Sequence, residues 1–392
     1  MKGSTVAKNL TKEPSTGKKV GKKVFLGMSG GVDSSVSAVL LKEQGYDVTG
    51  VYMKNWSQDL PGMKCPWAED LADAKRVAVQ LDLDFEVWDF EVDYKQKVVD
   101  YMLAEFQKGR TPNPDIICNE LIKFKLFYER ATQRGADFIA TGHYAQTDGQ
   151  NLLRAVDENK DQTYFLYRMS DVATARTLFP VGNLTKPEVK KLAAEKGLDV
   201  ATKKESMGVC FVGEVGMKDF LREYLPARPG EIREAETEQV LGYHDGAIFY
   251  TIGQRHGLYL GGGLPYYVVQ KDLVQNIVYV SKDLNYHSLW TRELVLEDLH
   301  WRGEGENSGI NHYSDGGGLV QDNQPDYLFS GGDLAQKPGL KVRLRHRAPL
   351  LDVKFAENKL IFAEPIRRPA AGQSAVLYHD NICLGGGIIT EA

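Results

Sequence analysis

The chain has 392 residues, of which 42% are hydrophobic and 26% charged, a composition typical of a soluble protein with two or three domains. No apolar run approaches the roughly 18 residues that span a bilayer, so no membrane association is expected. The formal net charge of −5 argues against a protein that coats nucleic acid non-specifically, although it leaves room for a local basic groove.

The first 23 residues carry seven lysines, one glutamate and no arginine. A secretory signal needs an apolar core and a mitochondrial transit peptide is rich in arginine, so neither is expected. We predict a disordered basic tail over residues 1–21 and a cytoplasmic protein. The four cysteines, at positions 65, 118, 210 and 383, form no Cys-x-x-Cys pair. A zinc or iron–sulfur site is therefore not expected, and reduced thiols are.

Short apolar segments alternate with longer amphipathic ones through the first half of the chain. This alternation predicts parallel strands joined by helices, in a doubly wound α/β sheet whose ligands collect beyond the carboxyl ends of the strands. The expected strands are residues 24–28, 48–53, 85–90 and 138–141, and the expected helices are 34–44, 68–81, 94–108 and 120–134. Residues 27–35, Met53 and residues 141–144 should then converge on one crevice.

Residues 27–35 (GMSGGVDSS) form a small-residue turn between the first strand and the first helix. Glycines let the backbone approach an anion, and the first N–H groups of the helix can bind it. Asp33 next to a phosphate is explained by a bridging Mg²⁺. The lysine of a Walker loop is missing, so this is a different phosphate cradle. The alternative is a strand-to-helix turn that binds no ligand.

Residues 111–119 (TPNPDIICN) lie between two expected helices, and the second is expected to start at or just after Cys118. A thiol at a helix N-terminus favours thiolate. Asp115 could act as a general base or orient an N–H group of a substrate. The alternatives are a small buried side chain for Cys118 and helix capping for Asp115. The second thiol of interest, Cys210, lies between glycines in residues 207–213 (MGVCFVG), and taken alone it is more readily explained as structural.

The pattern changes beyond residue 215, where short strands with glycine turns predict two small β domains, the last of them a barrel. The expected strands are residues 240–243, 247–251, 266–270, 276–280, 341–345, 350–355, 359–362 and 374–378. Residues 303–339 are rich in Gly, Asn, Asp and Ser and are predicted to be a surface insertion. In residues 341–347 (KVRLRHR), basic and apolar residues alternate, so a strand would present its cations on one face, suited to phosphates. A solvated charged strand is the alternative.

Seven motifs occur in an order that resembles the tRNA-specific 2-thiouridylase (MnmA/TrmU) family, from about residue 22 to about residue 390. They are SGGVDS (29–34), GRTPNPDIICN (109–119), ATGHYA (140–145), DQTYFL (161–166), GVCFVG (208–213), TIGQRHGL (251–258) and AGQSAV (371–376). The resemblance implies a PP-loop, adenine nucleotide alpha hydrolase-like catalytic domain over residues 22–215. A central β-rich tRNA-binding domain (216–284) and a C-terminal tRNA-binding β-barrel (285–392) follow.

The family replaces the C2 oxygen of the wobble uridine with sulfur and consumes ATP. Carried over to this chain, the resemblance implies that Cys210 holds a persulfide and that Cys118 attacks it or resolves it as a disulfide. Asp115 would lie by the target base, where it could take the uridine N3 proton. ATP with Mg²⁺ is implied at Gly27, Met28, Ser29, Gly30, Gly31, Val32, Asp33, Ser34, Met53 and Gly142.

The resemblance also implies partners. These are the tRNAs for lysine, glutamate and glutamine, and a sulfur-donor protein or cysteine desulfurase. The implied tRNA contacts are Asn113, Pro114, Asp115, His143, Lys160, Asp161, Gln162, Arg343, Leu344 and Gln373. The family has an arginine-tyrosine pair where this chain has Arg343 and Leu344, so a stacking ring is missing there.

Two other functions fit parts of the pattern. Another PP-loop enzyme would need cysteine pairs for a cluster, or an amidotransferase domain to use glutamine, and neither is seen. A non-catalytic tRNA-binding protein could keep the nucleotide pocket, but it would not need Asp33 together with the two thiols, Cys118 and Cys210.

Overall fold

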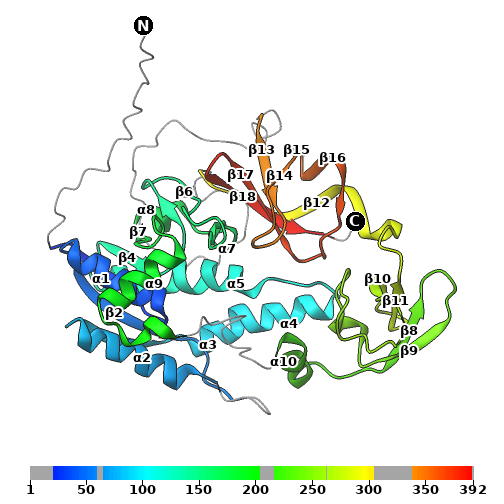
Figure 1. Ribbon diagram of the computed structural model, residues 1–392, viewed down its shortest axis with the longest axis horizontal. Coiled ribbons are helices and arrows are strands. Elements are labelled where there is room, and N and C mark those ends of the chain that lie inside the picture. Colours follow the sequence, from blue (N-terminus) through cyan, green and yellow to red (C-terminus); the bar gives the residue numbers. More distant parts are fainter. Residues whose placement is uncertain (1–20, 60–64, 204–215, 262, 304–337, 391–392) are drawn as a thin grey trace, which may run out of the picture.

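The computed structural model describes residues 21–59, 65–203, 216–261, 263–303 and 338–390. Figure 1 shows a parallel sheet with its helices on the left, a strongly curved sheet at the upper right and a smaller sheet at the lower right. The predicted tail (1–21) and insertion (303–339) fall almost entirely outside the described residues. Across the described ranges, no helix has both the length and the apolarity that a membrane span needs.

The N-terminal sheet has the order β3-β2-β1-β4-β7, and all its neighbouring strands are parallel. Its strands are β1 (Lys23–Gly27), β2 (Asp47–Lys54), β3 (Asp84–Asp89), β4 (Phe138–Thr141) and β7 (Thr177–Leu178). Its helices are α1 (Val32–Glu43), α2 (Trp67–Gln80), α3 (Glu91–Tyr94), η1 (Lys95–Val99), α4 (Asp100–Gln107), α5 (Pro114–Ile117), η2 (Cys118–Leu126), α6 (Phe127–Gln133), α7 (Thr163–Leu166), α8 (Asp171–Ala175), α9 (Lys186–Glu195) and η3 (Asp199–Thr202).

Alternation along β1 explains why helices cover both faces of this sheet. Val24 and Leu26 pack into one buried cluster with apolar residues of α1, α2 and α9. Phe25, which points the other way, packs into a second cluster with residues of η1, α4, η2 and α6. Both faces of the strands are buried, as expected for a doubly wound parallel sheet. The predicted fold class is confirmed here.

The second half of the chain is mainly β structure, as predicted. A helix, α10 (Met217–Tyr224), leads into a four-stranded sheet of order β10-β11-β8-β9, formed by β8 (Gly230–Glu234), β9 (Val240–His244), β10 (Tyr267–Asp272) and β11 (Ile277–Ser281). A nearly closed antiparallel barrel follows, in the order β14-β13-β17-β18-β12-β16-β15. Its strands are β12 (Trp290–Trp301), β13 (Leu340–Arg343), β14 (Leu351–Asp352), β15 (Lys354–Ala356), β16 (Lys359–Arg367), β17 (Ser374–His379) and β18 (Ile382–Ile389).

One expected strand is wrong, and another ends earlier than predicted. Residues 247–251 form a 3₁₀ turn, η4 (Ala247–Phe249), which packs two apolar side chains into the core instead of extending a sheet. The strand predicted over residues 341–345 is present as β13, but it ends at Arg343, before the remaining basic residues of the 341–347 segment. Its cations do not share one solvent face, because the side chain of Arg343 is buried.

A buried ion pair joins the barrel to the N-terminal domain. Arg343 of β13 donates to Asp161 at 2.6 Å, and the side chains are 5% and 0% exposed. The Asp161 carboxylate also accepts from the backbone N–H of Ala155 and from the hydroxyl of Thr163. Nearby, β6 (Leu152–Leu153), which pairs with β5 (Gln146–Thr147), adds to the barrel by pairing with β18. The two domains therefore share a sheet and a buried ion pair.

An Asp161→Ala variant is expected to lose about 3–5 kcal/mol of unfolding free energy, because Arg343 would be left buried without its partner. Urea denaturation followed by tryptophan fluorescence measures this loss. Lys341→Ala is the matched control on the same strand, because it removes the exposed ion pair with Asp352 and should cost no more than about 1 kcal/mol. Equal losses in the two variants would contradict a junction held by this pair.

Candidate functional site

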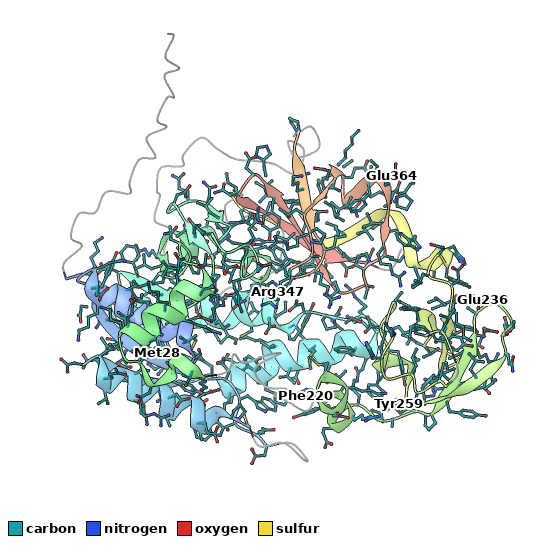
Figure 2. The ribbon with its side chains drawn as sticks, in the orientation of Figure 1. Met28, Phe220, Glu236, Tyr259, Arg347 and Glu364 are labelled. Atoms are coloured by element: carbon teal, nitrogen blue, oxygen red, sulfur yellow. The ribbon has the colours of Figure 1, made fainter. Side chains whose placement is uncertain are left out.

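A cavity of about 310 Å³ lies at the carboxyl ends of β1, β2 and β4. It sits at the switch point of the sheet, where Gly27 of β1 pairs with Thr141 of β4, and ligands bind at such points in open α/β folds. Met28, labelled in Figure 2, follows β1 directly and lines the cavity. The described lining residues are Gly27, Met28, Ser29, Asp33, Ser34, Tyr52, Met53, Asn55, Trp56, Cys65, Pro66, Trp67, Asp70, Lys123, Thr141, Gly142, His143 and Gln162.

Two positions of the cradle accept only glycine. Gly30 has φ +72°, and a Cβ there would lie 2.2 Å from the carbonyl oxygen of Asp70. A Cβ on Gly142 would lie 2.6 Å from the backbone nitrogen of Ser34, at the start of α1. The first turn of α1 is capped by Gly31, which has no side chain, so its N–H groups keep their capacity to bind an anion.

Ser34 closes the turn from within. Its hydroxyl accepts from the backbone N–H of Ser29 at 3.2 Å and donates to the carbonyl of Gly31 at 3.1 Å. These bonds fix the loop before any ligand arrives. Val32 is buried in the core and takes no part in the cavity lining, so its predicted nucleotide contact would have to come from its backbone.

Asp33 is held in one orientation by two donors. Its Oδ1 accepts from the hydroxyl of Tyr144 at 2.9 Å and from the ammonium of Lys186 at 2.6 Å. No donor among the described residues is bonded to Oδ2, and the side chain is 32% exposed at the cavity. One carboxylate oxygen therefore suits a cation such as Mg²⁺ that bridges to a phosphate.

A second lysine, Lys203, supports the cradle from outside the cavity. Lys203 donates to the carbonyl of Gly30 at 3.2 Å and to Asp70 at 2.8 Å, and it also contacts Asp73. Burial opposes the charge of Lys203, but its hydrogen bonds to the two carboxylates raise its pKa overall. Neither Lys186 nor Lys203 was found from the sequence, since each lies more than 150 residues beyond the loop it supports and belongs to no local motif.

The segment with Asp115 and Cys118 departs from the prediction at its helix boundary. The helix starts at Pro114, with Asn113 as N-cap accepting from the N–H of Asp115 at 3.1 Å. Proline is favoured at the first helical position and asparagine at the cap, so these two residues move the start forward. Cys118 is thus one turn inside the helix, at the first residue of the π-helical η2. It is 2% exposed and packs in the core, so the expected helix-terminal thiol is wrong.

Lys123 connects this segment to the cavity. Burial raises the pKa of Asp115, and the nearby charge of Lys123 opposes that rise. Burial also lowers the pKa of His143 well below its usual value, and Lys123 lowers it further. His143 is therefore a neutral imidazole near pH 7, with Nδ1 2.8 Å from the hydroxyl of Thr141.

The loop before Asp115 is held by the other two domains. Gln373 donates to the carbonyl of Thr111 at 2.6 Å, and the N–H of Thr111 donates to Ala371 at 2.7 Å. The hydroxyl of Thr111 also lies 3.1 Å from that of Thr251, in the TIGQRHGL motif. Lys271 of β10 donates to Gly109 at 2.6 Å. The barrel and the central sheet therefore position the Asp115–Cys118 segment.

The predicted tRNA contacts fall into two groups. Gln162 and His143 line the cavity, and the side chain of Gln162 accepts from the N–H of Tyr144 at 2.9 Å. Asp161 and Arg343 are buried and pair with each other at the domain junction, whereas Leu344 is buried in the core of the barrel. Arg347, labelled in Figure 2, is exposed beside them and donates to the carbonyl of Asn159. Lys123 and Cys65 also line the cavity. The sequence did not mark Lys123, and it gave Cys65 no role in the site.

One further prediction cannot be placed on this geometry. Cys210 lies outside the described residues, so its position relative to Cys118 is not described. No group of three or more His, Cys, Asp or Glu in the described part of the chain is arranged to hold a metal ion.

Three family models match the chain in succession. They are the tRNA methyl transferase HUP domain over residues 22–214, the tRNA methyl transferase PRC-barrel domain over 218–282 and the aminomethyltransferase beta-barrel domain over 326–389.

The chain is also similar to proteins named tRNA-specific 2-thiouridylase MnmA. The relative from Idiomarina loihiensis is 45% identical and covers 94% of this chain and 96% of its own length. The Listeria monocytogenes relative is 44% identical, with 94% of each chain covered. The Haemophilus ducreyi relative is 45% identical, with 94% of this chain and 92% of its own length covered.

This similarity extends over nearly the whole chain and includes both halves of the site described above. The protein belongs to the tRNA-specific 2-thiouridylase MnmA family.

Proposed function

We propose that this chain catalyses the ATP-dependent 2-thiolation of the wobble uridine of tRNA. The observation that carries the proposal is the cavity at the β1/β4 switch point, lined by Asp33 and the glycine cradle in a member of this family. This cavity would hold ATP, and Oδ2 of Asp33, the carboxylate oxygen that Tyr144 and Lys186 leave open, would be available to hold its Mg²⁺. Met53 and Gly142 lie on the adenosine side of this site.

The chemistry begins with activation of the uridine, because its C2 oxygen is a poor leaving group. The O2 atom attacks the α-phosphorus of ATP, the bond to the β-phosphate breaks, and pyrophosphate leaves with the electron pair. The N3 proton of the uridine passes to the carboxylate of Asp115. Burial raises the pKa of this carboxyl, which makes it a stronger base than an exposed aspartate.

Sulfur transfer then replaces the adenylated oxygen. The persulfide of Cys210 attacks C2, and AMP leaves with the C2–O electron pair. The Cys118 thiolate attacks the Sγ of Cys210, forming a disulfide and leaving the terminal sulfur on C2 as the thiocarbonyl. A persulfide is a stronger nucleophile than a thiol at neutral pH, which is why two cysteines are required. Since Cys118 is 2% exposed, the resolving step requires a rearrangement around η2.

The partners are proposed from the family to which the chain belongs. The substrates are the cytoplasmic tRNAs for lysine, glutamate and glutamine, and a cysteine desulfurase or sulfur-carrier protein loads Cys210. The uridine must leave its stack to reach a cavity inside the sheet, so the anticodon base is flipped. Asn113, Pro114, His143, Lys160, Gln162 and Gln373 contact the tRNA, and the barrel supports it near Arg343 and Leu344.

The test is incubation of the purified chain with unmodified tRNA for lysine, ATP, Mg²⁺, a cysteine desulfurase and cysteine. Mass spectrometry of the digested tRNA should then show 2-thiouridine that depends on ATP. Formation of a methylated nucleoside, or binding of tRNA without any modified product, would contradict the proposal.

A further inference from the structure

Lys123 is the only lysine or arginine among the described residues that line the cavity. The other two lysines near the cradle are engaged, Lys186 by Asp33 and Lys203 by Asp70 and Asp73. Within the described ranges Lys123 forms no ion pair with a carboxylate. A nucleotide bound in this cavity carries several negative charges. The ammonium of Lys123, which is paired with no carboxylate in the described part of the chain, is therefore a candidate to contact them.

The position of Lys123 relates it to both halves of the site. It lies on η2, five residues after Cys118, and residues five apart in a π-helix are joined by i→i+5 hydrogen bonds. Lys123 therefore follows Cys118 by about one turn. Its charge acts both on Asp115, at the start of the same helical segment, and on His143, at the end of β4. Lys123 thus lines the same cavity as the cradle and lies within electrostatic range of the segment that is to receive the uridine.

We propose, resting on the function proposed above, that Lys123 is a catalytic residue whose ammonium contacts the α-phosphate of ATP during adenylation. As O2 of the uridine bonds to the α-phosphorus, negative charge grows on the non-bridging oxygens, and a fixed cation in a secluded cavity stabilises it. The bond to pyrophosphate breaks, and the N3 proton goes to Asp115. In the following step the same ammonium stabilises AMP as it leaves C2.

The alternative is that Lys123 only supports the folded helix. Lys125 provides the matched control, because it is an exposed lysine on the same π-helical segment and does not line the cavity. Lys123→Met, Lys123→Arg and Lys125→Met are compared with the wild-type chain. The measurements are single-turnover release of pyrophosphate on tRNA for lysine, tRNA affinity, and circular dichroism.

Lys123→Met should slow pyrophosphate release by about 10²–10³-fold, the range found when one transition-state donor is removed. Its tRNA affinity and spectrum should stay at wild-type values, and Lys123→Arg should recover part of the rate. A direct contact with the α-phosphate also predicts a selective effect of sulfur there. The wild type should distinguish the two diastereomers of adenosine 5′-O-(1-thiotriphosphate) more strongly than Lys123→Met does.

Several outcomes overturn the proposal. One is a rate for Lys123→Met that equals that of Lys125→Met, and another is a rate loss matched by an equal loss of tRNA binding. Unchanged discrimination between the thio diastereomers excludes the contact itself. If Lys123→Met does not fold, Lys123→Gln takes its place under the same criteria. A wild-type chain that makes no 2-thiouridine would instead overturn the proposed function, so the two failures are distinguishable.

Discussion

A Cys210→Ser variant is expected to lose at least about 10³-fold of the rate of 2-thiouridine formation, in line with removal of a nucleophile that acts as part of a unit. A serine hydroxyl cannot carry a sulfane sulfur, so the adenylated uridine would have no sulfur donor. The activation step does not involve this thiol, so tRNA-dependent cleavage of ATP to AMP and pyrophosphate should persist. The two products are measured side by side, 2-thiouridine by mass spectrometry and pyrophosphate by a coupled assay.

Cys383→Ala is the matched control for this experiment. Burial raises the pKa of Cys383 to about 12, so its thiol stays protonated and is not expected to exchange sulfur. This variant should thiolate tRNA at the wild-type rate. If the Cys210→Ser variant still thiolates tRNA, Cys210 does not carry the sulfur as a persulfide. If the Cys383→Ala variant loses thiolation, loss of a cysteine reduces activity by disturbing the fold.

The second large effect is expected from Asp115→Asn, which should abolish thiolation and leave tRNA binding largely intact. Asparagine has the shape of aspartate and leaves the Asn113 cap in place, but its amide cannot accept the N3 proton. Unlike Cys210→Ser, this variant should fail at activation, so pyrophosphate release on tRNA should also stop. Gel-shift affinity, pyrophosphate release and 2-thiouridine content separate binding from chemistry.

The pH dependence of the wild-type chain gives an independent reading of Asp115. Burial raises its pKa above the ordinary carboxyl value, so the base form is lost as the pH falls through that raised value. The rate of pyrophosphate release should therefore decline on the acid side at a higher pH than an exposed aspartate would give. Survival of activity in Asp115→Asn would exclude the aspartate as the base.

The architecture was predictable because the spacing of apolar residues along the sequence follows which side chains are buried. In the N-terminal half, apolar runs such as Val24, Phe25 and Leu26 are buried on both faces, which marks parallel strands. Boundaries were harder, because they depend on caps. Asn113 and Pro114 start the helix one turn before Cys118, whereas the sequence predicted a start at or just after Cys118. Residues 247–251 look like a strand, yet tertiary packing of Ala247 and Phe249 turns them into a 3₁₀ segment.

The candidate site was predictable where its parts lie in one motif or at strand ends. Residues 27–29, Asp33 and Ser34 of the cradle line one cavity with Met53, Gly142 and His143, because parallel strands end at the same edge. Pairings between distant segments left no trace in the sequence. Lys186 meets Asp33 across 153 positions, and Arg343 meets Asp161 across 182. The alternation of basic and apolar residues around Arg343 suggested an exposed basic face. Arg343 is instead buried, because it pairs with Asp161 of the N-terminal domain.

The central claim is that the C2 oxygen of the uridine is transferred to AMP, and an isotope label tests it directly. tRNA for lysine with ¹⁸O at the C2 oxygen of its wobble uridine is thiolated by the wild-type chain, and the AMP is analysed by mass spectrometry. The account predicts one ¹⁸O in the phosphate of AMP for each 2-thiouridine formed, and none when unlabelled tRNA reacts in ¹⁸O-water. Unlabelled AMP recovered alongside 2-thiouridine from the labelled tRNA would contradict it.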